Sequence, residues 1–419
     1  MTNKSPELLE EHKDWLMCSE CGELQSLVAI SPEHEVVCYN CDHVLHAGHG
    51  RWLEIASALT VTAFILFFIS VFFPVLTLEI GGQSRDVTIL DGFWALMARD
   101  SWILAALIIT TLFLFPLFEI FALLYLVLPY SLNKHLPGQA QVLKWLIQAR
   151  SWSMLEVFLL SMVVASVKMA DMAVLYLEVA TYTLFILVGV LILAVFYLDK
   201  TKLWSWINTN NYYTTSVEEK IYDCRVCHAM VGESVVHSRK TCPRCDTDIH
   251  WRIPNSLQKT TALLIAAVVL YIPANVLPIM TYSTLGAVET DTILSGVIAL
   301  VGAKLYWVAA VVFTASIGVP IFKLMILAYL VIAVRWKIKL GVKHRAFLFR
   351  LTEVLGRWSM VDVFVVTLFV ALVQFGFVYT VEPEGAIIAF AAVVVITMVA
   401  AETFDPRLLW DVLDEENDK

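Results

Sequence analysis

Charged residues are scarce in this 419-residue sequence, because Asp, Glu, Lys and Arg together supply only 16% of it. Soluble domains carry about 25%, so a soluble enzyme of this length is disfavoured. Hydrophobic residues make up 59% of the chain, which excludes an intrinsically disordered protein. Basic residues are also in the minority, and the formal net charge is −9. A general nucleic-acid binder needs a basic face, so we expect no nucleic-acid partner.

Motifs of the common catalytic folds are missing as well. The sequence has no G-x-x-x-x-G-K-[ST] phosphate-binding loop, no G-x-S-x-G nucleophile turn and no H-E-x-x-H metalloprotease helix. Haem ligation inside a membrane would need histidines within the apolar runs, and all ten histidines lie outside them. We therefore expect that the protein is not an enzyme.

Long apolar runs dominate what is present. A membrane-spanning helix needs about 20 mostly apolar residues, and we find eight such runs. Barrel strands would alternate in hydrophobicity, so the runs predict an α-helical polytopic membrane protein. The third and fourth runs are close in sequence, as are the seventh and eighth, and each pair predicts a tight helical hairpin. The predicted spans are Trp52–Leu76, Ser101–Leu128, Trp152–Ala170, Ala173–Leu198, Leu257–Met280, Leu305–Val334, Trp358–Phe375 and Gly385–Thr403.

The basic residues of the loops are distributed unequally between the two sides of the predicted membrane. Nearly all lie on the side of the N-terminus, whereas the other side holds Arg85, Arg99 and Lys304. Because Lys and Arg mark the cytoplasmic side, both termini are predicted to be cytoplasmic. Segments Gln141–Arg150 and Arg345–Arg357 mix apolar and basic residues, which is typical of interfacial helices.

The chain repeats itself after about 205 residues, and such self-similarity indicates a duplicated architecture. Pro74–Leu76 returns as Pro278–Met280, and Trp152–Met154 returns as Trp358–Met360. Each copy holds a cysteine-rich segment and four spans, so both copies share one orientation and form a tandem parallel repeat. The predicted parts are a zinc ribbon (1–50), a four-helix unit (51–205), a second ribbon (206–255), a second four-helix unit (256–411) and an acidic tail (412–419).

All eight cysteines lie in the two polar segments that precede the helical units. In each segment they form two C-x2-C pairs, which supply four thiolates to a tetrahedral ion. We predict two structural Zn²⁺ ions, since four protein ligands leave no position for a catalytic water. Disulfides are disfavoured in the reducing cytosol, iron is an open alternative, and the neighbouring His43 and His228 are expected to be bystanders. The predicted ligands are Cys18, Cys21, Cys38, Cys41, Cys224, Cys227, Cys242 and Cys245.

Polar residues inside lipid are costly and are therefore candidates for function. Lys323 and Glu119 occupy the same position of the repeat with opposite charges, and Glu156 and Asp362 are equivalent acids. We hypothesise a polar network between the two helical units, centred on Lys323, which binds a lipid headgroup or relays protons. The alternative is that Lys323 forms a structural ion pair or extends to the interface. The other predicted members are Ser153, Ser316, Ser359, Thr397 and Asn275.

Taken together, these features resemble the paraquat-inducible protein A family. Two four-cysteine ribbons, each followed by four spans, are similar to that family, and so are the runs Pro273–Ile279, Gly356–Phe364 and Phe404–Asp411. The first half is similar more loosely, because Arg150–Trp152 stands where the second half has Gly356–Trp358.

The resemblance implies a bacterial inner-membrane protein that works with a periplasmic mammalian-cell-entry (MCE) domain protein. The implied function is the movement of phospholipid or a related lipid between the inner membrane and the tunnel of that partner. Two alternatives stay open. One is a membrane scaffold or stress-response protein that docks partners through its ribbons, and the other is a redox sensor that uses the ribbon thiols.

Overall fold

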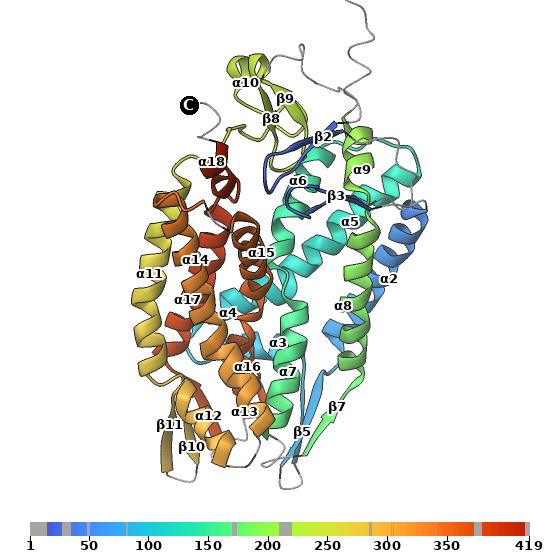
Figure 1. The fold of residues 1–419 in the computed structure, drawn as a ribbon. Helices are drawn as coiled ribbons and strands as arrows, with labels where there is room; N and C mark the ends of the chain where they lie inside the picture. Colours follow the sequence, from blue (N-terminus) through green and yellow to red (C-terminus); the bar gives the residue numbers. More distant parts are fainter. Residues whose placement is uncertain are drawn as a thin grey trace, which may run out of the picture.

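Two helical units lie side by side in the computed structural model, with two cysteine-rich ribbons at one end and two small sheets at the other (Figure 1). We call these the ribbon end and the sheet end. Eight helices among the described residues are long and apolar enough to cross a membrane, which confirms the predicted polytopic helical fold. The structure describes residues 15–26, 35–47, 51–80, 83–169, 174–208, 220–284, 287–302, 304, 306–339, 341–372 and 379–414.

The first helical unit contains four spans, of which the second and third are interrupted. Pro116 lies in the first turn of α5, and it has no backbone N–H to donate to the preceding helical turn. A π-helical turn directly before it absorbs the mismatch. In chain order the elements are α2 (Trp52–Phe72), α4 (Trp102–Ile109), the π-helix η1 (Thr110–Leu114), α5 (Phe115–Ser131), α6 (Gln139–Ala149), the 3₁₀ turn η2 (Arg150–Trp152), α7 (Leu155–Met169) and α8 (Val179–Tyr197).

The second helical unit repeats this order, including the π-helical turn before Pro320. Its third span differs from the third span of the first unit, because α15 and α16 form a nearly continuous segment that is more deeply buried. The elements are α11 (Ser256–Val276), α13 (Tyr306–Phe313), the π-helix η3 (Thr314–Gly318), α14 (Val319–Arg335), α15 (Val342–Trp358), α16 (Val361–Leu372) and α17 (Gly385–Thr403).

The sheet end corrects the expected tight helical hairpins. A strand follows the third span of each unit and pairs antiparallel with a β-hairpin that follows the first span, with Leu76 opposite Leu177 and Met280 opposite Pro383. Short apolar segments do not distinguish helix from strand by composition alone, so the sequence did not reveal these strands. They are β5 (Leu76–Ile80), β6 (Gln83–Val87), β7 (Val174–Leu177), β10 (Met280–Thr284), β11 (Ala287–Asp291) and β12 (Tyr379–Pro383), with α3 (Ile89–Met97) and α12 (Ile293–Gly302) after the hairpins.

Each ribbon is built from short antiparallel strands that carry the cysteines on the turns beside them. The helical units end nearby in two short helices, and Asp199 caps the first of them by accepting a hydrogen bond from the Lys202 N–H at 3.0 Å. The elements are β1 (Trp15–Met17), β2 (Leu24–Ser26), β3 (Glu35–Val37) and β4 (Val44–Ala47), then α9 (Lys200–Ile207), β8 (Ile221–Asp223), β9 (Met230–Gly232), α10 (Glu233–Arg239) and α18 (Leu408–Asp414). The tail beyond residue 414 lies outside the described residues.

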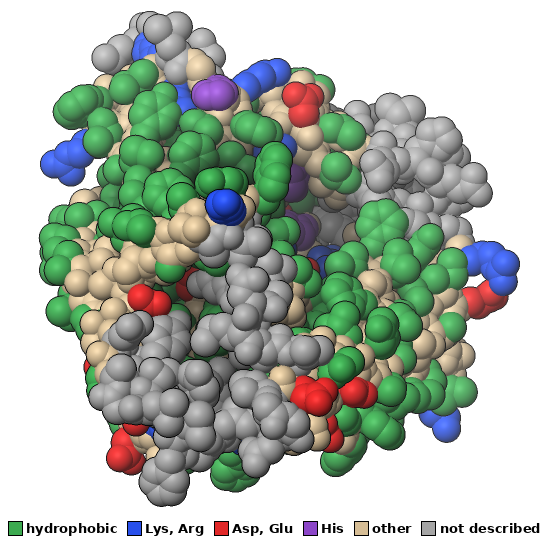
Figure 2. All heavy atoms as spheres, turned by 90° about the horizontal axis from the view of Figure 1, so that it is seen from below, with side chains coloured by type: hydrophobic (Ala, Val, Ile, Leu, Met, Phe, Trp, Pro, Cys, Tyr) green, Lys and Arg blue, Asp and Glu red, His purple; other side chains and the backbone are tan. Residues whose placement is uncertain are grey.

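We call the interface between the two units the seam, and α7 and α16 pack against each other within it. Phe158 and Phe364 face each other there edge to face, with ring centres 6.0 Å apart, and the Ser161 hydroxyl donates to the Val361 carbonyl at 3.0 Å. Gly92 of α3 also packs closely on α16, because an added Cβ would lie 2.8 Å from the Thr367 methyl. Seen from the sheet end, hydrophobic side chains cover much of the described flanks and charged ones are few (Figure 2).

Candidate functional site

Four similar turns present the cysteines of the two ribbons. The residue after the second cysteine of each C-x2-C pair has a positive φ, and its amide donates to the carbonyl of the first cysteine at 2.8–2.9 Å. This backbone conformation reverses the chain so that both thiols point to one side. His228 is one of these turn residues, which explains its place beside a pair. The four residues are Gly22, Asp42, His228 and Asp246.

The sulfur atoms of each ribbon form a compact group that fits one metal ion. Within the first ribbon, Cys18 and Cys41 are 3.5 Å apart and Cys21 and Cys38 are 3.6 Å apart. The equivalent distances in the second ribbon are 3.4 and 3.6 Å. A disulfide needs about 2.05 Å, whereas thiolates 2.3 Å from a tetrahedral ion lie about 3.8 Å from one another. All eight thiols are free and buried, so both groups can hold a metal ion.

Each ribbon packs on the helical unit of the other repeat. The cysteines of the first ribbon share a hydrophobic cluster with Leu330 of α14, Phe349 of α15 and Leu409 of α18, all in the second unit. Those of the second ribbon share a cluster with Leu143 of α6 and Trp204 of α9 in the first unit. The two copies are therefore crossed at the ribbon end rather than stacked as independent modules.

Polar contacts reinforce the docking of the first ribbon on α15. The Arg350 guanidinium donates to the Cys41 carbonyl at 2.7 Å. Glu20 lies between two ligand cysteines, and its burial together with the neighbouring Glu353 raises the pKa of its carboxyl to about 7. An acid that is buried beside a second acid binds a proton more readily, so Glu20 exchanges a proton near neutral pH.

Arg407 joins both ribbons to the second unit. Its guanidinium pairs with the Asp223 carboxylate of the second ribbon at 2.8 Å, and both side chains are at most 5% exposed. Its Nε donates to the Ser19 carbonyl of the first ribbon at 3.1 Å. One buried cation thus contacts two parts of the chain that are remote from it and from each other in sequence.

A cavity of about 350 Å³ lies between the two units, and we call it the seam cavity. Lys323 of α14 reaches it with a fully buried side chain, and its Nζ has no hydrogen-bond partner among the described residues. The ammonium lies against Gly356 of α15, where an added Cβ would be only 2.9 Å from Nζ. The seam cavity is lined by Ile147, Arg150, Ser151, Lys323, Thr352, Glu353, Val354, Gly356, Arg357, Met398, Ala401 and Glu402.

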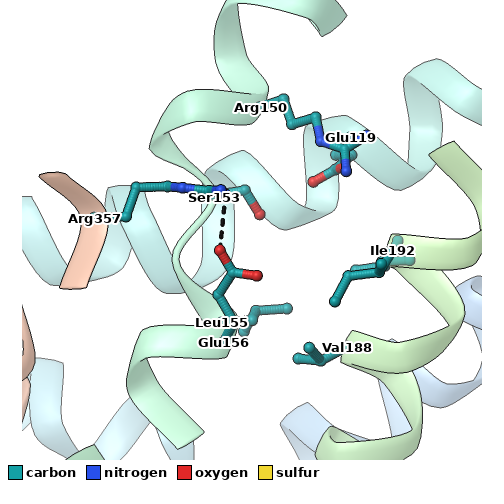
Figure 3. A pocket seen from close by; sticks show the side chains of 9 residues that line it. Glu119, Arg150, Ser153, Leu155, Glu156, Val188, Ile192 and Arg357 are labelled. Carbon is teal, nitrogen blue, oxygen red and sulfur yellow. Dashed lines mark ion pairs between the residues drawn. The ribbon is translucent and has the colours of Figure 1, made fainter. Parts of the chain in front are cut away.

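A second polar pocket lies on the first unit and shares Arg150 and Arg357 with the seam cavity (Figure 3). Glu156 at the start of α7 pairs with Arg357 of α15 at 2.7 Å, which links the two units across the seam. Glu119 of α5 is almost fully buried beside Arg150. Oppositely charged groups from both repeats therefore meet at this pocket, and each offsets part of the desolvation cost of the other.

The residues predicted for the polar network fall into separate groups. Lys323 lines the seam cavity, whereas Glu119, Glu156 and Ser153 line the second pocket. The other five line neither of them. Ser316 and Ser359 are buried with hydroxyls that have no partner among the described residues, Thr397 donates to the Val394 carbonyl, Asn275 donates to the Tyr271 carbonyl at 2.9 Å, and Asp362 lies at the start of the buried helix α16.

Four charged residues of these cavities escaped the sequence reasoning. Arg150, Glu353 and Arg357 lie in the segments predicted to be interfacial helices, where charged residues are expected. Glu402 lies within the last apolar run, where an acidic residue is by itself an indication of a functional position. Their convergence on one cavity depends on how the two units pack, and no local pattern records it.

Comparison with known proteins gives matches along nearly the whole chain. The family model for paraquat-inducible protein A matches residues 53–208 and 257–414, once in each repeat. The "Intermembrane transport protein PqiA" of Escherichia coli K12 is 33% identical over 407 residues, which cover 94% of this chain and 95% of that protein.

Two further relatives match at similar length. The "Lipophilic envelope-spanning tunnel protein A" of Escherichia coli K12 is 30% identical over 96% of this chain and 93% of its own. A "Probable intermembrane transport protein" of Haemophilus influenzae is 33% identical over 96% of this chain and 97% of its own. No solved structure matches the chain. With both repeats matched and the relatives aligned almost from end to end, this protein belongs to the paraquat-inducible protein A family.

Proposed function

We propose that the protein is an inner-membrane subunit of an MCE-type lipid transport system, in which it moves phospholipid between the inner membrane and a periplasmic tunnel protein. Its relatives are named as intermembrane transport and envelope-spanning tunnel proteins rather than as enzymes, which supports a transport role. The observation that carries the proposal is Lys323, a buried cation that faces a cavity between the two units and finds no hydrogen-bond partner in the described part of the chain. Such a costly group is best explained by a ligand or proton that uses it.

The proposed orientation places the ribbon end in the cytoplasm and the sheet end in the periplasm. Nearly all loop Lys and Arg residues lie at the ribbon end, and the positive-inside rule assigns that end to the cytoplasm. The two small sheets would then project toward the periplasmic MCE partner, which has to receive the lipid.

Zn²⁺ is the metal we propose for both ribbons. Four thiolates with no open position match a structural zinc site, and the ion would stabilise a fold too small to hold itself together by its own core. The Gln25 amide donates to the Cys38 sulfur at 2.8 Å, which is a contact that a metal-bound thiolate accepts.

We propose that the lipid or the coupled proton binds at the seam. In this proposal Lys323 binds a headgroup or exchanges a proton, while Glu119, Glu156 and Ser153 hold the neighbouring pocket, and Ser316, Ser359, Asp362, Thr397 and Asn275 supply further polar positions within the spans. A scaffold that only docks partners would need no buried cation facing a cavity, and a redox sensor would need reactive thiols rather than thiolates occupied by a metal. Neither alternative accounts for Lys323.

Replacing Lys323 with Ala is expected to abolish transport while the protein stays folded in the membrane. The change removes one charge from the cavity, and because no salt bridge of Lys323 is present among the described residues, the helices lose no ion pair. The measurement is transfer of labelled phospholipid from vesicles that hold the protein to its periplasmic partner. Arg335→Ala removes a cation of the same helix that is exposed and serves as the control. Normal transfer by the Lys323→Ala protein would contradict the proposal.

Gly356→Ala is expected to reduce transport about tenfold or more, because the new methyl displaces the Lys323 ammonium and small displacements at a site have large effects on rate. Stability should change by less than about 1 kcal/mol, since Ala suits a helix better than Gly and the lysine end can move into the cavity. Gly296→Ala, whose Cβ would meet nothing within 4 Å, is the matched control. Equal transport by both variants would show that the position of Lys323 is unimportant.

A further inference from the structure

The seam cavity presents charges of both signs. Its cations are Lys323, Arg150 and Arg357, and its acids are Glu353 and Glu402. They come from the turn after α6 in the first unit and from α14, α15 and α17 in the second. The volume of about 350 Å³ is within the usual range of small-molecule sites, about 300–1,000 Å³. Residues of both repeats therefore build a small site of mixed charge.

The cations of this cavity have N–H donors that are available to a ligand. Among the described residues, Lys323 Nζ has no hydrogen-bond partner, and the Arg150 guanidinium has no ion pair or hydrogen bond, although Glu119 lies near it. Arg357 pairs with Glu156 through one nitrogen, so most of its five N–H donors are available. Guanidinium groups match the geometry of phosphate oxygens. The cations of the cavity are thus suited to bind a phosphate group.

Two acids, Glu353 and Glu402, line the same cavity. Glu402 is next to the last residue of α17 (Gly385–Thr403), and its charge acts on both Lys323 and Glu353. Two neighbouring carboxylates repel each other and favour a cation between them. An ammonium group near Glu353 and Glu402 would therefore add to the cations that already act on these acids, Lys323 on Glu402 and Arg225 on Glu353.

The depth of the cavity fits a headgroup. Helix α17 has 19 residues, which span about 28 Å at 1.5 Å per residue, close to the hydrocarbon thickness of a bilayer of about 30 Å. Glu402 at its ribbon end therefore lies at the level where headgroups begin. Apolar side chains of Ile147, Val354 and Met398 complete the lining, and Val354 is exposed on the outside of the bundle.

We propose that the seam cavity binds a zwitterionic lipid headgroup of the phosphoethanolamine class. The phosphate lies toward Arg150, Arg357 and Lys323, and the primary ammonium lies toward Glu353 and Glu402. A headgroup with phosphate alone brings no cation to the two acids, so it is bound less well. This inference rests on the proposed lipid transport. It specifies the class of headgroup and assigns roles to four more residues, Arg150, Arg357, Glu353 and Glu402.

The test is lipid retention by the full-length protein. The protein is reconstituted in vesicles of equal parts phosphatidylethanolamine and phosphatidylglycerol, extracted in mild detergent, and its bound lipids are counted by native mass spectrometry. We expect phosphatidylethanolamine to be retained about fivefold over phosphatidylglycerol. Glu402→Gln should bring that ratio toward one, while Arg150→Gln should reduce retention of both lipids. Glu54→Gln and Arg335→Gln, which change exposed charges elsewhere, should behave as the unaltered protein.

The outcomes separate this inference from the proposed function. Equal retention of the two lipids, or the same ratio in Glu402→Gln as in Glu54→Gln, overturns the headgroup assignment but leaves lipid transport standing. Retention of no lipid by the unaltered protein contradicts both. If Glu402→Gln fails to fold, Glu353→Gln replaces it with the same expectation. Water-soluble glycerophosphoethanolamine is added to delipidated protein as a further arm, and binding as tight as that of the lipid would assign the site to a free metabolite instead.

Discussion

A Cys224→Ser variant is expected to lose the metal of the second ribbon and to loosen the ribbon end of the first helical unit. The ligand cysteines of this ribbon share a hydrophobic cluster with Trp52, Leu143 and Trp204 of that unit. Structural zinc supplies about 10–16 kcal/mol in small peptide domains, so the ribbon should unfold once one ligand is gone. Its packing surface on the other repeat is then lost as well.

The measurement combines metal content with hydrogen exchange. We expect two zinc ions per unaltered chain and one per Cys224→Ser chain, with faster amide exchange in α6 and α9. Cys18→Ser is the matched experiment, and it should instead accelerate exchange in α14, α15 and α18. If each cysteine change loosened the unit of its own repeat, the crossed packing would be wrong. If the metal were iron, the elemental analysis would show it directly.

An Arg407→Ala variant is expected to lose about 3–5 kcal/mol of stability at the ribbon end, which is the usual cost of breaking a buried ion pair from one side. The change leaves the Asp223 carboxylate, which is 1% exposed, without its guanidinium partner. It also removes the donor to the Ser19 carbonyl of the first ribbon. Because one side chain contacts both ribbons, both should become mobile together.

Limited proteolysis of the two ribbons, followed over temperature, measures this effect. Arg51→Ala is the control, because Arg51 and Glu54 form an exposed pair and such pairs contribute only about 0–1 kcal/mol. Arg407→Ala should lower the temperature at which both ribbons are cleaved, whereas Arg51→Ala should leave it almost unchanged. Cleavage of only one ribbon would contradict the joint role of Arg407.

The duplicated positions at the seam carry opposite chemistry. Glu119 and Lys323 occupy equivalent positions of the repeat. Arg150 and Gly356 are also equivalent, and Glu119 lies beside Arg150 just as Lys323 lies beside Gly356. A large cation beside an acid in one copy thus corresponds to a glycine beside a cation in the other. After duplication the two copies have become complementary across the seam instead of remaining symmetric.

The sequence by itself determined the features that depend on local composition. Eight apolar runs give eight spans because about 20 apolar residues are enough to cross a bilayer, and the repeated motifs fix the duplication. The C-x2-C spacing brings two thiols to one turn, so the ligand sets follow from neighbours in the chain. The acid and lysine inside the spans were also visible, since any charge within an apolar run stands out.

Only the tertiary structure decided which of these parts meet. The ribbons sit on the opposite helical units, and Arg407 joins Asp223 to Ser19, through contacts between residues far apart in the chain. Arg150, Arg357, Glu353 and Glu402 look like ordinary charges at the ends of spans, and they form a site because α6, α15 and α17 converge at the seam. The sheets at the opposite end exist for the same reason, because a strand is completed by hydrogen bonds to a partner that the local sequence does not name.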